Sequence, residues 1–247
     1  MSRFIQKAIN SIISLIVFAC LCIAGIYAGY ALYDNNRIYT QAQNVQEDML
    51  QYKPTKDNKK AFEELRKINK DVCAWVTLDN TNIDYPVLYG EDNITYINRD
   101  VYGEFALAGS IFLDYRNDKN FMDAYSILYG HHMDNHKMFG DLDLYKEEKF
   151  FRKNQTGSLI LPDRSYKLKI FAIVLVSASD DYIFDPTPWQ NDMSSLITYV
   201  ISNGMYINKD TIHELQQTIN PQVLAFTTCS SEFTDARTIV LTMMEPE

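Results

Sequence analysis

The sequence predicts a mainly β domain, closed as a barrel or packed as a sandwich, that follows a helical segment and one transmembrane helix. Short apolar runs rich in β-branched and aromatic residues recur from residue 74 onward, and turn residues separate them. A long uncharged segment lies near the N-terminus. About 210 residues follow that segment, which is enough for one domain with a sizeable core.

The uncharged segment covers residues 8–32, which are 25 residues in all. At about 1.5 Å per residue, a helix of this length is roughly 37 Å long and can cross a bilayer. Arg3 and Lys7 precede it, and positive charge on a short leading segment favours a cytoplasmic N-terminus. A cleaved signal peptide is the alternative, but the segment exceeds an ordinary signal core and no clear small-residue cleavage site follows it. We therefore expect a single-pass membrane protein whose chain lies outside the cell after Asp34.

We expect three parts along the chain: a cytoplasmic tip and transmembrane anchor in residues 1–36, a helical stem in residues 37–72, and the β domain in residues 73–247. The stem begins with a polar helix over residues 37–52, which Pro54 ends. Its narrow apolar stripe consists of Ile38, Ala42, Val45 and Met49. A second helix is predicted with Asp57 as its N-cap. The face that packs on the domain consists of Ala61, Phe62, Leu65 and Ile68.

Eight short strands are expected in the β domain, with a few helices between them. The predicted strands are residues 74–78, 85–88, 110–113, 125–129, 158–161, 166–177, 223–228 and 238–243. The predicted helices are near residues 138–145, 147–153 and 193–202.

The part of the chain outside the membrane is acidic. Without Arg3 and Lys7, 21 of the 23 basic residues remain against 32 acidic ones, a net charge of about −11. Binding to nucleic acid depends on a basic surface. We therefore expect no nucleic acid partner.

Two of the four cysteines, Cys73 and Cys229, lie outside the apolar segment. They could form a disulfide in an oxidising compartment. Such a bridge would consume the thiol whose surroundings suggest catalysis, so we expect both to be free. Cys73 stands beside Trp75 in an apolar stretch and is predicted to be a small core residue.

Three reactive side chains stand at the ends of predicted strands. Cys229 follows the apolar run 223–228, Arg237 opens the next one, and His131 follows a strand that stops at Gly130. We expect this glycine to let the backbone turn sharply and present the imidazole. A thiol needs a nearby base or cation to react as a thiolate. If the strands are neighbours, the three residues form a nucleophilic cysteine site.

Other interpretations of these residues compete with that one. His132 and His136 are alternatives to His131, and Arg237 could pair with Asp235 or Glu232 on the surface. The histidine-rich segment 131–136 also suggests metal binding, but it lacks the spacing of zinc sites, and no EF-hand spacing occurs in the chain. We therefore expect no metal and no cofactor.

The chain resembles the sortases, and most closely the class B sortases, over nearly its whole length. The resemblance is carried by Tyr129-Gly130-His131-His132-Met133, by Gly109-Ser110-Ile111-Phe112-Leu113-Asp114, and by Thr228-Cys229 followed by Ala236-Arg237. One departure concerns the usual Thr-Leu-x-Thr-Cys signature, which stands here as Ala225-Phe226-Thr227-Thr228-Cys229. The change at Thr227 would alter hydrogen bonding beside the thiol.

The resemblance implies an eight-stranded sortase-type β-barrel and a membrane-anchored cysteine transpeptidase of a Gram-positive bacterium. Such an enzyme cleaves a C-terminal sorting motif of secreted proteins, of the Asn-Pro-x-Thr or a related Pro-x-Thr type. It then transfers them to an amine of a cell-wall peptidoglycan precursor or cross-bridge. The resemblance makes Cys229 the nucleophile, His131 the general acid and Arg237 the group that steadies the substrate carbonyl.

The substrate groove is predicted along residues 179–202, whose alternative role is aromatic packing over the barrel. Candidate substrate-binding residues are Thr227, Thr228, Ser230, Glu232, Tyr182 and Trp189. Asp114 is a further residue that could approach the site. Alternative functions are a sortase that joins pilin subunits, an exported cysteine peptidase that only hydrolyses, and a surface domain without catalysis.

Overall fold

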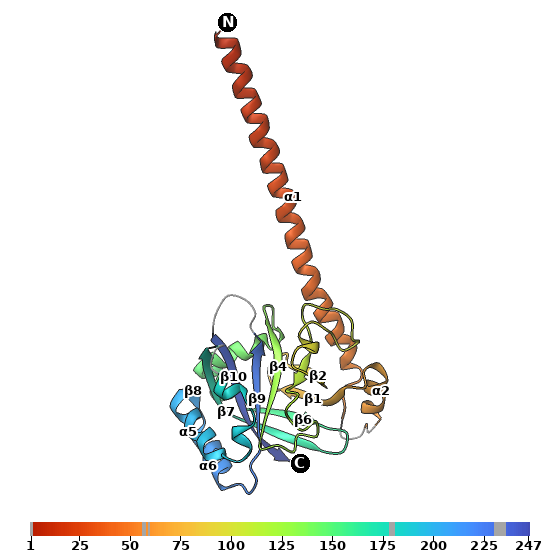
Figure 1. Ribbon diagram of the computed structural model, residues 1–247, viewed down its shortest axis with the longest axis vertical. Coiled ribbons are helices and arrows are strands. Elements are labelled where there is room, and N and C mark those ends of the chain that lie inside the picture. Colours follow the sequence, from red (N-terminus) through yellow and green to blue (C-terminus); the bar gives the residue numbers. More distant parts are fainter. Residues whose placement is uncertain (1, 56–57, 59, 178–180, 230–235) are drawn as a thin grey trace. The chain divides into compact units, whose positions relative to one another are not determined.

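The computed structural model describes residues 2–55, 58, 60–177, 181–229 and 236–247 of the chain. The chain divides into two compact units, Met1–Gln41 and Ala42–Glu247. The described residues of the first unit all lie in helix α1 (Ser2–Leu50), which Figure 1 shows. Apolar side chains on it are open, as Leu15 at 70% and Ile26 at 74% exposure show. This helix is long and apolar enough to cross a membrane, with a mean hydropathy of 2.5 in its most apolar window.

The helix predicted for residues 37–52 is not a separate element. It is the last part of α1, which runs without a break from Ser2 to Leu50. Within the second unit, Ala42 and Met49 of the predicted stripe are buried and Val45 is half-buried. Helix α2 (Ala61–Ile68) follows and buries Ala61, Phe62 and Leu65. Lys60 stands at its N-cap position, and the predicted cap Asp57 lies outside the described residues.

Eight strands close into a barrel, as predicted from the spacing of the apolar runs. They are β1 (Val72–Leu78), β2 (Asp84–Tyr89), β3 (Ile111–Leu113), β4 (Tyr125–Met133), β6 (Thr156–Ile160), β7 (Ser165–Ser177), β9 (Val223–Cys229) and β10 (Ala236–Pro246). Their order is β10-β9-β4-β3-β2-β1-β6-β7, and the pairing of β10 with β7 closes the ring. The pairs β2–β3 and β4–β9 are parallel, and the other pairs of the ring are antiparallel.

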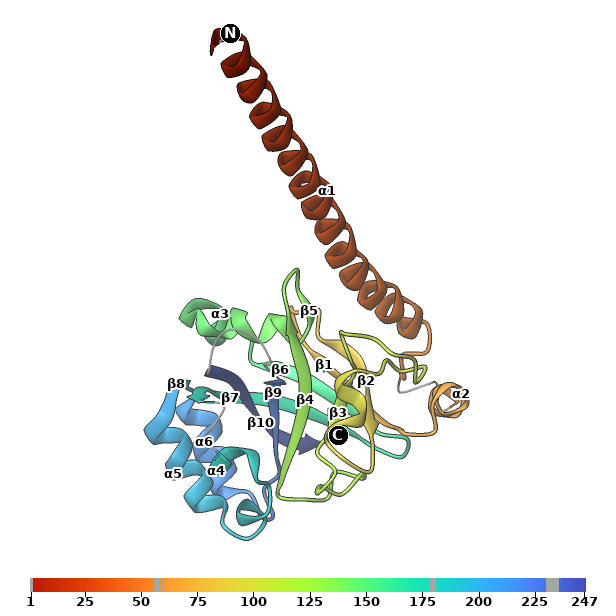
Figure 2. The ribbon, with the colours of Figure 1, turned by 45° about the horizontal axis from the view of Figure 1, so that its top comes forward.

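Two layers of buried side chains lie on the two faces of this sheet. Inside the barrel, side chains from all eight strands form one cluster, which includes Val76, Leu128, Leu168, Phe226 and Val240. A second cluster covers the outer face and contains residues of the surrounding helices. These are α2, α4 (Asp181–Phe184), α5 (Met193–Asn203) and α6 (Lys209–Gln217). Figure 2 shows α4, α5 and α6 together on the side of β7.

Several short elements complete the second unit. The predicted helices near residues 138–145 and 147–153 are η2 (Gly140–Lys146) and α3 (Glu148–Lys153). The sequence did not predict η1 (Thr95–Ile97), η3 (Pro188–Gln190), β5 (Lys137–Met138), β8 (Gly204–Ile207) or α6. A signal for α6 does exist, because the Asn208 side chain caps it and Ile212 and Leu215 form a buried face.

We expect Phe226→Ala to lower the free energy of unfolding by about 3–5 kcal/mol, because the ring fills the barrel interior and its removal leaves a cavity. Phe226 is fully buried, and its centroid lies 5.7 Å from that of Phe139. Urea unfolding followed by circular dichroism measures the change. Phe105→Ala is the matched control, since Phe105 is 70% exposed and its loss should change stability by less than about 0.5 kcal/mol. Equal effects of the two variants would contradict this description of the core.

Candidate active site

Strands β4 and β9 bring the histidine and the cysteine to the same rung of the sheet. Their parallel register runs without a shift from Tyr125 opposite Val223 to His131 opposite Cys229. Neighbouring strands lie about 4.8 Å apart, so the two backbone positions are direct neighbours. Both faces of this pair are buried, which explains why both strands are nearly continuous apolar runs.

Strand β10 brings the arginine to the other side of the cysteine strand. Its antiparallel register with β9 runs from Met243 opposite Val223 to Ile239 opposite Thr227. Arg237 is two residues before Ile239 in β10, and Cys229 is two residues after Thr227 in β9, so both lie at the same end of this strand pair. The Arg237 Nη1 atom contacts the Thr228 carbonyl oxygen at 3.5 Å, beside this position. The three predicted residues therefore occupy one end of three neighbouring strands, with β9 in the middle.

The His131 ring is half-buried, and its Nε2 atom lies 2.8 Å from the backbone carbonyl oxygen of Ile97 in η1. The sequence could not predict this contact, because any residue can supply a backbone carbonyl.

The prediction that β4 turns sharply at Gly130 was wrong, because the strand continues to Met133. Close packing is the reason for this glycine. A Cβ atom at residue 130 would lie 2.5 Å from the Ile111 side chain and 2.8 Å from the Phe139 ring.

The Arg237 side chain is half-buried and lies against an aromatic ring. Its Cζ atom is 5.3 Å from the ring centroid of Phe184 in α4, which is a cation–π contact. Its Nε atom is buried and has no hydrogen-bond partner among the described residues. This N–H donor is therefore not used by any described residue of the protein.

The two other histidines of the segment each have a carboxylate partner. His132 Nε2 lies 3.0 Å from Asp143, and His136 Nδ1 lies 2.5 Å from the buried Asp141. The hydrogen bond to Asp143 raises the pKa of His132. These pairs join the β4–β5 hairpin to η2, a structural role. Among the residues that the structure describes, no group of three or more metal-binding side chains comes together.

The predicted substrate-binding residues differ in exposure. The Tyr182 side chain is 51% exposed. Trp189 is 1% exposed, and its indole nitrogen donates to the Tyr182 carbonyl oxygen at 3.2 Å. The burial of Trp189 matches the alternative of aromatic packing and disagrees with direct substrate contact. Thr227 and Thr228 are also buried, so their side chains pack within the sheet. The predicted residues Ser230 and Glu232 lie outside the described residues.

Cys73 is a free thiol in the barrel, as predicted for a core residue. Burial raises the pKa of this thiol to about 12, and Sγ lies 3.4 Å from the Val87 carbonyl oxygen. A thiol that stays protonated at neutral pH is inert as a nucleophile.

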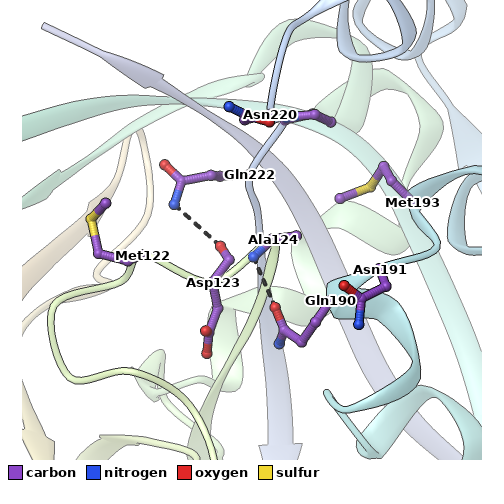
Figure 3. A pocket seen from close by; sticks show the side chains of 9 residues that line it. Met122, Asp123, Ala124, Gln190, Asn191, Met193, Asn220 and Gln222 are labelled. Atoms are coloured by element: carbon purple, nitrogen blue, oxygen red, sulfur yellow. Dashed lines mark hydrogen bonds between the residues drawn. The ribbon is translucent and has the colours of Figure 1, made fainter.

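A polar pocket of about 660 Å³ opens where β4 and β9 begin. Figure 3 shows that Gln190 and Gln222 reach into this region, and both bind backbone atoms. Gln190 accepts from the Ala124 backbone nitrogen at 2.9 Å, and Gln222 donates to the Asp123 carbonyl at 3.2 Å. The pocket lies roughly 20 Å along the strands from His131, at about 3.3 Å per residue. It is therefore separate from the candidate active site.

Comparisons with known proteins agree with this architecture. The chain is 31% identical over 188 residues to sortase B of Staphylococcus aureus, which covers 76% of this chain and 75% of that protein. It is 28% identical over 232 residues to sortase B of Listeria monocytogenes, with 92% of each chain covered. A solved class B sortase of Streptococcus pyogenes, involved in pilus biogenesis, matches with a TM-score of 0.67 and 36% identity. That match covers 74% of this chain and 97% of the other. No protein-family model matches the chain.

The closed eight-stranded barrel and these similarities define a cysteine transpeptidase of the sortase type. The chain belongs to the class B sortases, which confirms the resemblance seen in its motifs.

We expect the His132–Asp143 pair to stabilise the fold at acidic pH more than at alkaline pH. Because the pKa of His132 is raised above 6.5, this contribution is fully present below pH 6.5 and is lost as pH rises through the folded-state pKa. Asp143 stays ionised over this range, since its pKa is lowered to about 2. Both side chains are more than a third exposed, so the effect should stay below about 1 kcal/mol.

Urea unfolding of the wild type and of His132→Gln at pH 5 and at pH 8 measures this difference in stability. The wild type should exceed the variant by more at pH 5 than at pH 8. His213→Gln is the control, because His213 faces the neutral Gln217. A gap between wild type and His132→Gln that does not change with pH would refute the assigned pair.

Proposed function

We propose that Cys229, His131 and Arg237 carry out the transpeptidation, with Cys229 as nucleophile, His131 as general acid and Arg237 as the group that stabilises the substrate oxyanion. The register of β4, β9 and β10, which brings the three positions to adjacent strand ends, is the observation that carries this proposal.

The first step forms a thioester. The Cys229 thiolate attacks the carbonyl carbon of the scissile peptide bond, the carbon–sulfur bond forms, and the carbon–nitrogen bond breaks. His131 gives a proton to the departing amine. In the second step an acceptor amine attacks the thioester and releases the thiolate, and His131 takes the proton that the amine loses. Attack by water in place of the amine would give hydrolysis.

Arg237 suits the oxyanion role because its charge is permanent and its donors form a rigid fork. The Phe184 ring, whose centroid lies 5.3 Å from the Arg237 Cζ atom, supports the guanidinium through a cation–π contact. The Nε atom has no hydrogen-bond partner among the described residues, so this donor is not committed to another described group.

We infer that the substrates are secreted proteins that carry a C-terminal motif of the Asn-Pro-x-Thr or a related Pro-x-Thr type, and that the acceptor is a cell-wall amine. The supporting finding is the similarity to sortase B proteins over most of the chain. Joining of pilin subunits is the second candidate, since the similar Streptococcus pyogenes enzyme is involved in pilus biogenesis.

We propose that residues 1–36 anchor the enzyme in the cell membrane with the N-terminus in the cytoplasm, that residues 37–72 form its stem, and that residues 73–247 form the extracellular catalytic domain. The uncharged segment 8–32 and the basic Arg3 and Lys7 support this topology. Tethering at one surface raises the effective concentrations of enzyme, protein substrate and acceptor. This advantage favours a transpeptidase over a peptidase that only hydrolyses.

We expect the full chain in detergent to form a covalent acyl adduct at Cys229 when it is offered a library of Pro-x-Thr peptides. Mass spectrometry of the intact protein detects the adduct, and Cys229→Ala should form none. Cys73→Ala is the matched control and should retain the adduct, because that thiol is buried. Addition of a glycine oligomer or a diaminopimelate-type amine separates transpeptidation from hydrolysis by the product formed. An adduct that persists in Cys229→Ala would refute the assigned nucleophile.

We expect Arg237→Lys to lower the rate of adduct formation by on the order of a hundredfold, although the charge is kept. A lysine ammonium cannot present two donors in a plane to a carbonyl oxygen. Rates from stopped reactions with one peptide measure the loss. Arg152→Lys is the control, since Arg152 lies on the surface and pairs with Glu148 one helical turn away. Near-normal rates in Arg237→Lys would overturn the role given to the guanidinium.

A further inference from the structure

We propose that Arg116 is a positioning residue for the reaction. It holds the segment around Phe184 in place, so that the Phe184 ring stays against the guanidinium of Arg237. This inference rests on the proposed role of Arg237. It assigns a task to a residue that lies outside the motifs from which the site was predicted.

Arg116 is fixed from one side by a buried carboxylate. Asp114 follows directly after β3 and is fully buried. Arg116 Nε lies 2.9 Å from Asp114 Oδ1 and Nη2 lies 2.6 Å from Oδ2, which is a two-pronged pair. Asp114 also accepts hydrogen bonds from the Tyr129 hydroxyl at 3.1 Å and from Asn93 at 3.0 Å. Because Tyr129 lies in β4 two residues before His131, this carboxylate is held by the rigid part of the barrel.

Arg116 holds the α4 segment with its remaining donors. Nη2 donates to the Phe184 carbonyl oxygen at 2.6 Å, and Nη1 lies 3.3 Å from Asp185. The neighbouring carboxylates raise the pKa of the guanidinium, so it stays charged. One side chain therefore bridges the segment after β3 and the end of α4, and Arg116 and Phe184 are 68 residues apart in the chain.

Phe184 in turn supports Arg237. The distance from the Arg237 Cζ atom to the Phe184 centroid is 5.3 Å, whereas the hydrogen bond to the Thr228 carbonyl is long at 3.5 Å. The Nε atom of Arg237 has no partner among the described residues. The aromatic contact is thus a main restraint on the guanidinium, and it depends on where Arg116 holds the Phe184 backbone. The alternative is that Arg116 only neutralises Asp114.

Arg116→Lys separates these two roles. A lysine keeps a positive charge beside Asp114, but it cannot bind both carboxylate oxygens and the Phe184 carbonyl. We expect the rate of Cys229 acylation by saturating peptide to fall between about ten- and a hundredfold, because small misplacements of a catalytic group are costly. The Michaelis constant for the peptide should change less. Arg152→Lys is again the control, with no change expected.

A double-mutant cycle tests whether Arg116 acts through Phe184. If it does, Arg116→Lys in the background of Phe184→Leu should lower the rate by less than about twofold further. Independent, multiplying effects would overturn the proposal, and so would a normal rate in Arg116→Lys alone. If Arg116→Lys fails to fold by circular dichroism, the pair Asp114→Asn with Arg116→Gln removes both charges and serves in its place.

An NMR measurement that does not depend on catalysis tests the positioning role of Arg116 separately from the proposed role of Arg237. In the full chain in detergent micelles, labelled with ¹⁵N-arginine, the ring current of Phe184 should displace the Arg237 Nε–H signal. Arg237→Lys identifies that signal by removing it. Arg116→Lys should move it to the position that it has in Phe184→Leu. A signal that Arg116→Lys does not move would contradict the positioning role of Arg116. A near-normal acylation rate in Arg237→Lys would instead contradict the role of Arg237 in the reaction.

Discussion

The parallel pairing of β4 with β9 is the constraint on which the rest of the site depends. The two strands are separated by almost ninety residues, which form η2, α3, β6, β7 and the helices of the outer face. A slip of one residue would move every side chain of a strand to the other face. The register resists such a slip because Leu128 and Phe226 fill the barrel, while Ile127 and Ala225 are buried on the outer face. The apolar packing of the strands thus determines where His131 and Cys229 meet.

Arg237 is held in a different way. Its strand, β10, pairs with β9 on one side and with β7 on the other, and Arg237 itself stands opposite Val176 in the pairing with β7. The guanidinium itself extends beyond these ladders and contacts Phe184, which belongs to the segment over the outer face. The position of the charge therefore depends on the loop after β7 as well as on the barrel.

The filled interior of the barrel leaves its rim as the place for the proposed chemistry. Side chains from all eight strands occupy the inside, and Cys73 among them is a buried thiol with a raised pKa. A cysteine can react only where a substrate can reach it, at a strand end near charged groups. The acidic partners of His132 and His136 keep those rings at η2, so that of the three neighbouring histidines only His131 stands on the rung of Cys229.

The sequence by itself determined the eight strands, the long apolar helix and the three residues at strand ends. These features follow from local patterns, such as the runs ending at Thr228 and beginning at Arg237, and such patterns depend on near neighbours in the chain. Other features were decided by the tertiary structure alone. Gly130 leaves room for the Ile111 and Phe139 side chains, the Trp189 ring packs 6.5 Å from that of Tyr125, and Arg116 joins Asp114 to Phe184. These contacts join segments far apart in the chain, and no local pattern of residues encodes which segments will meet.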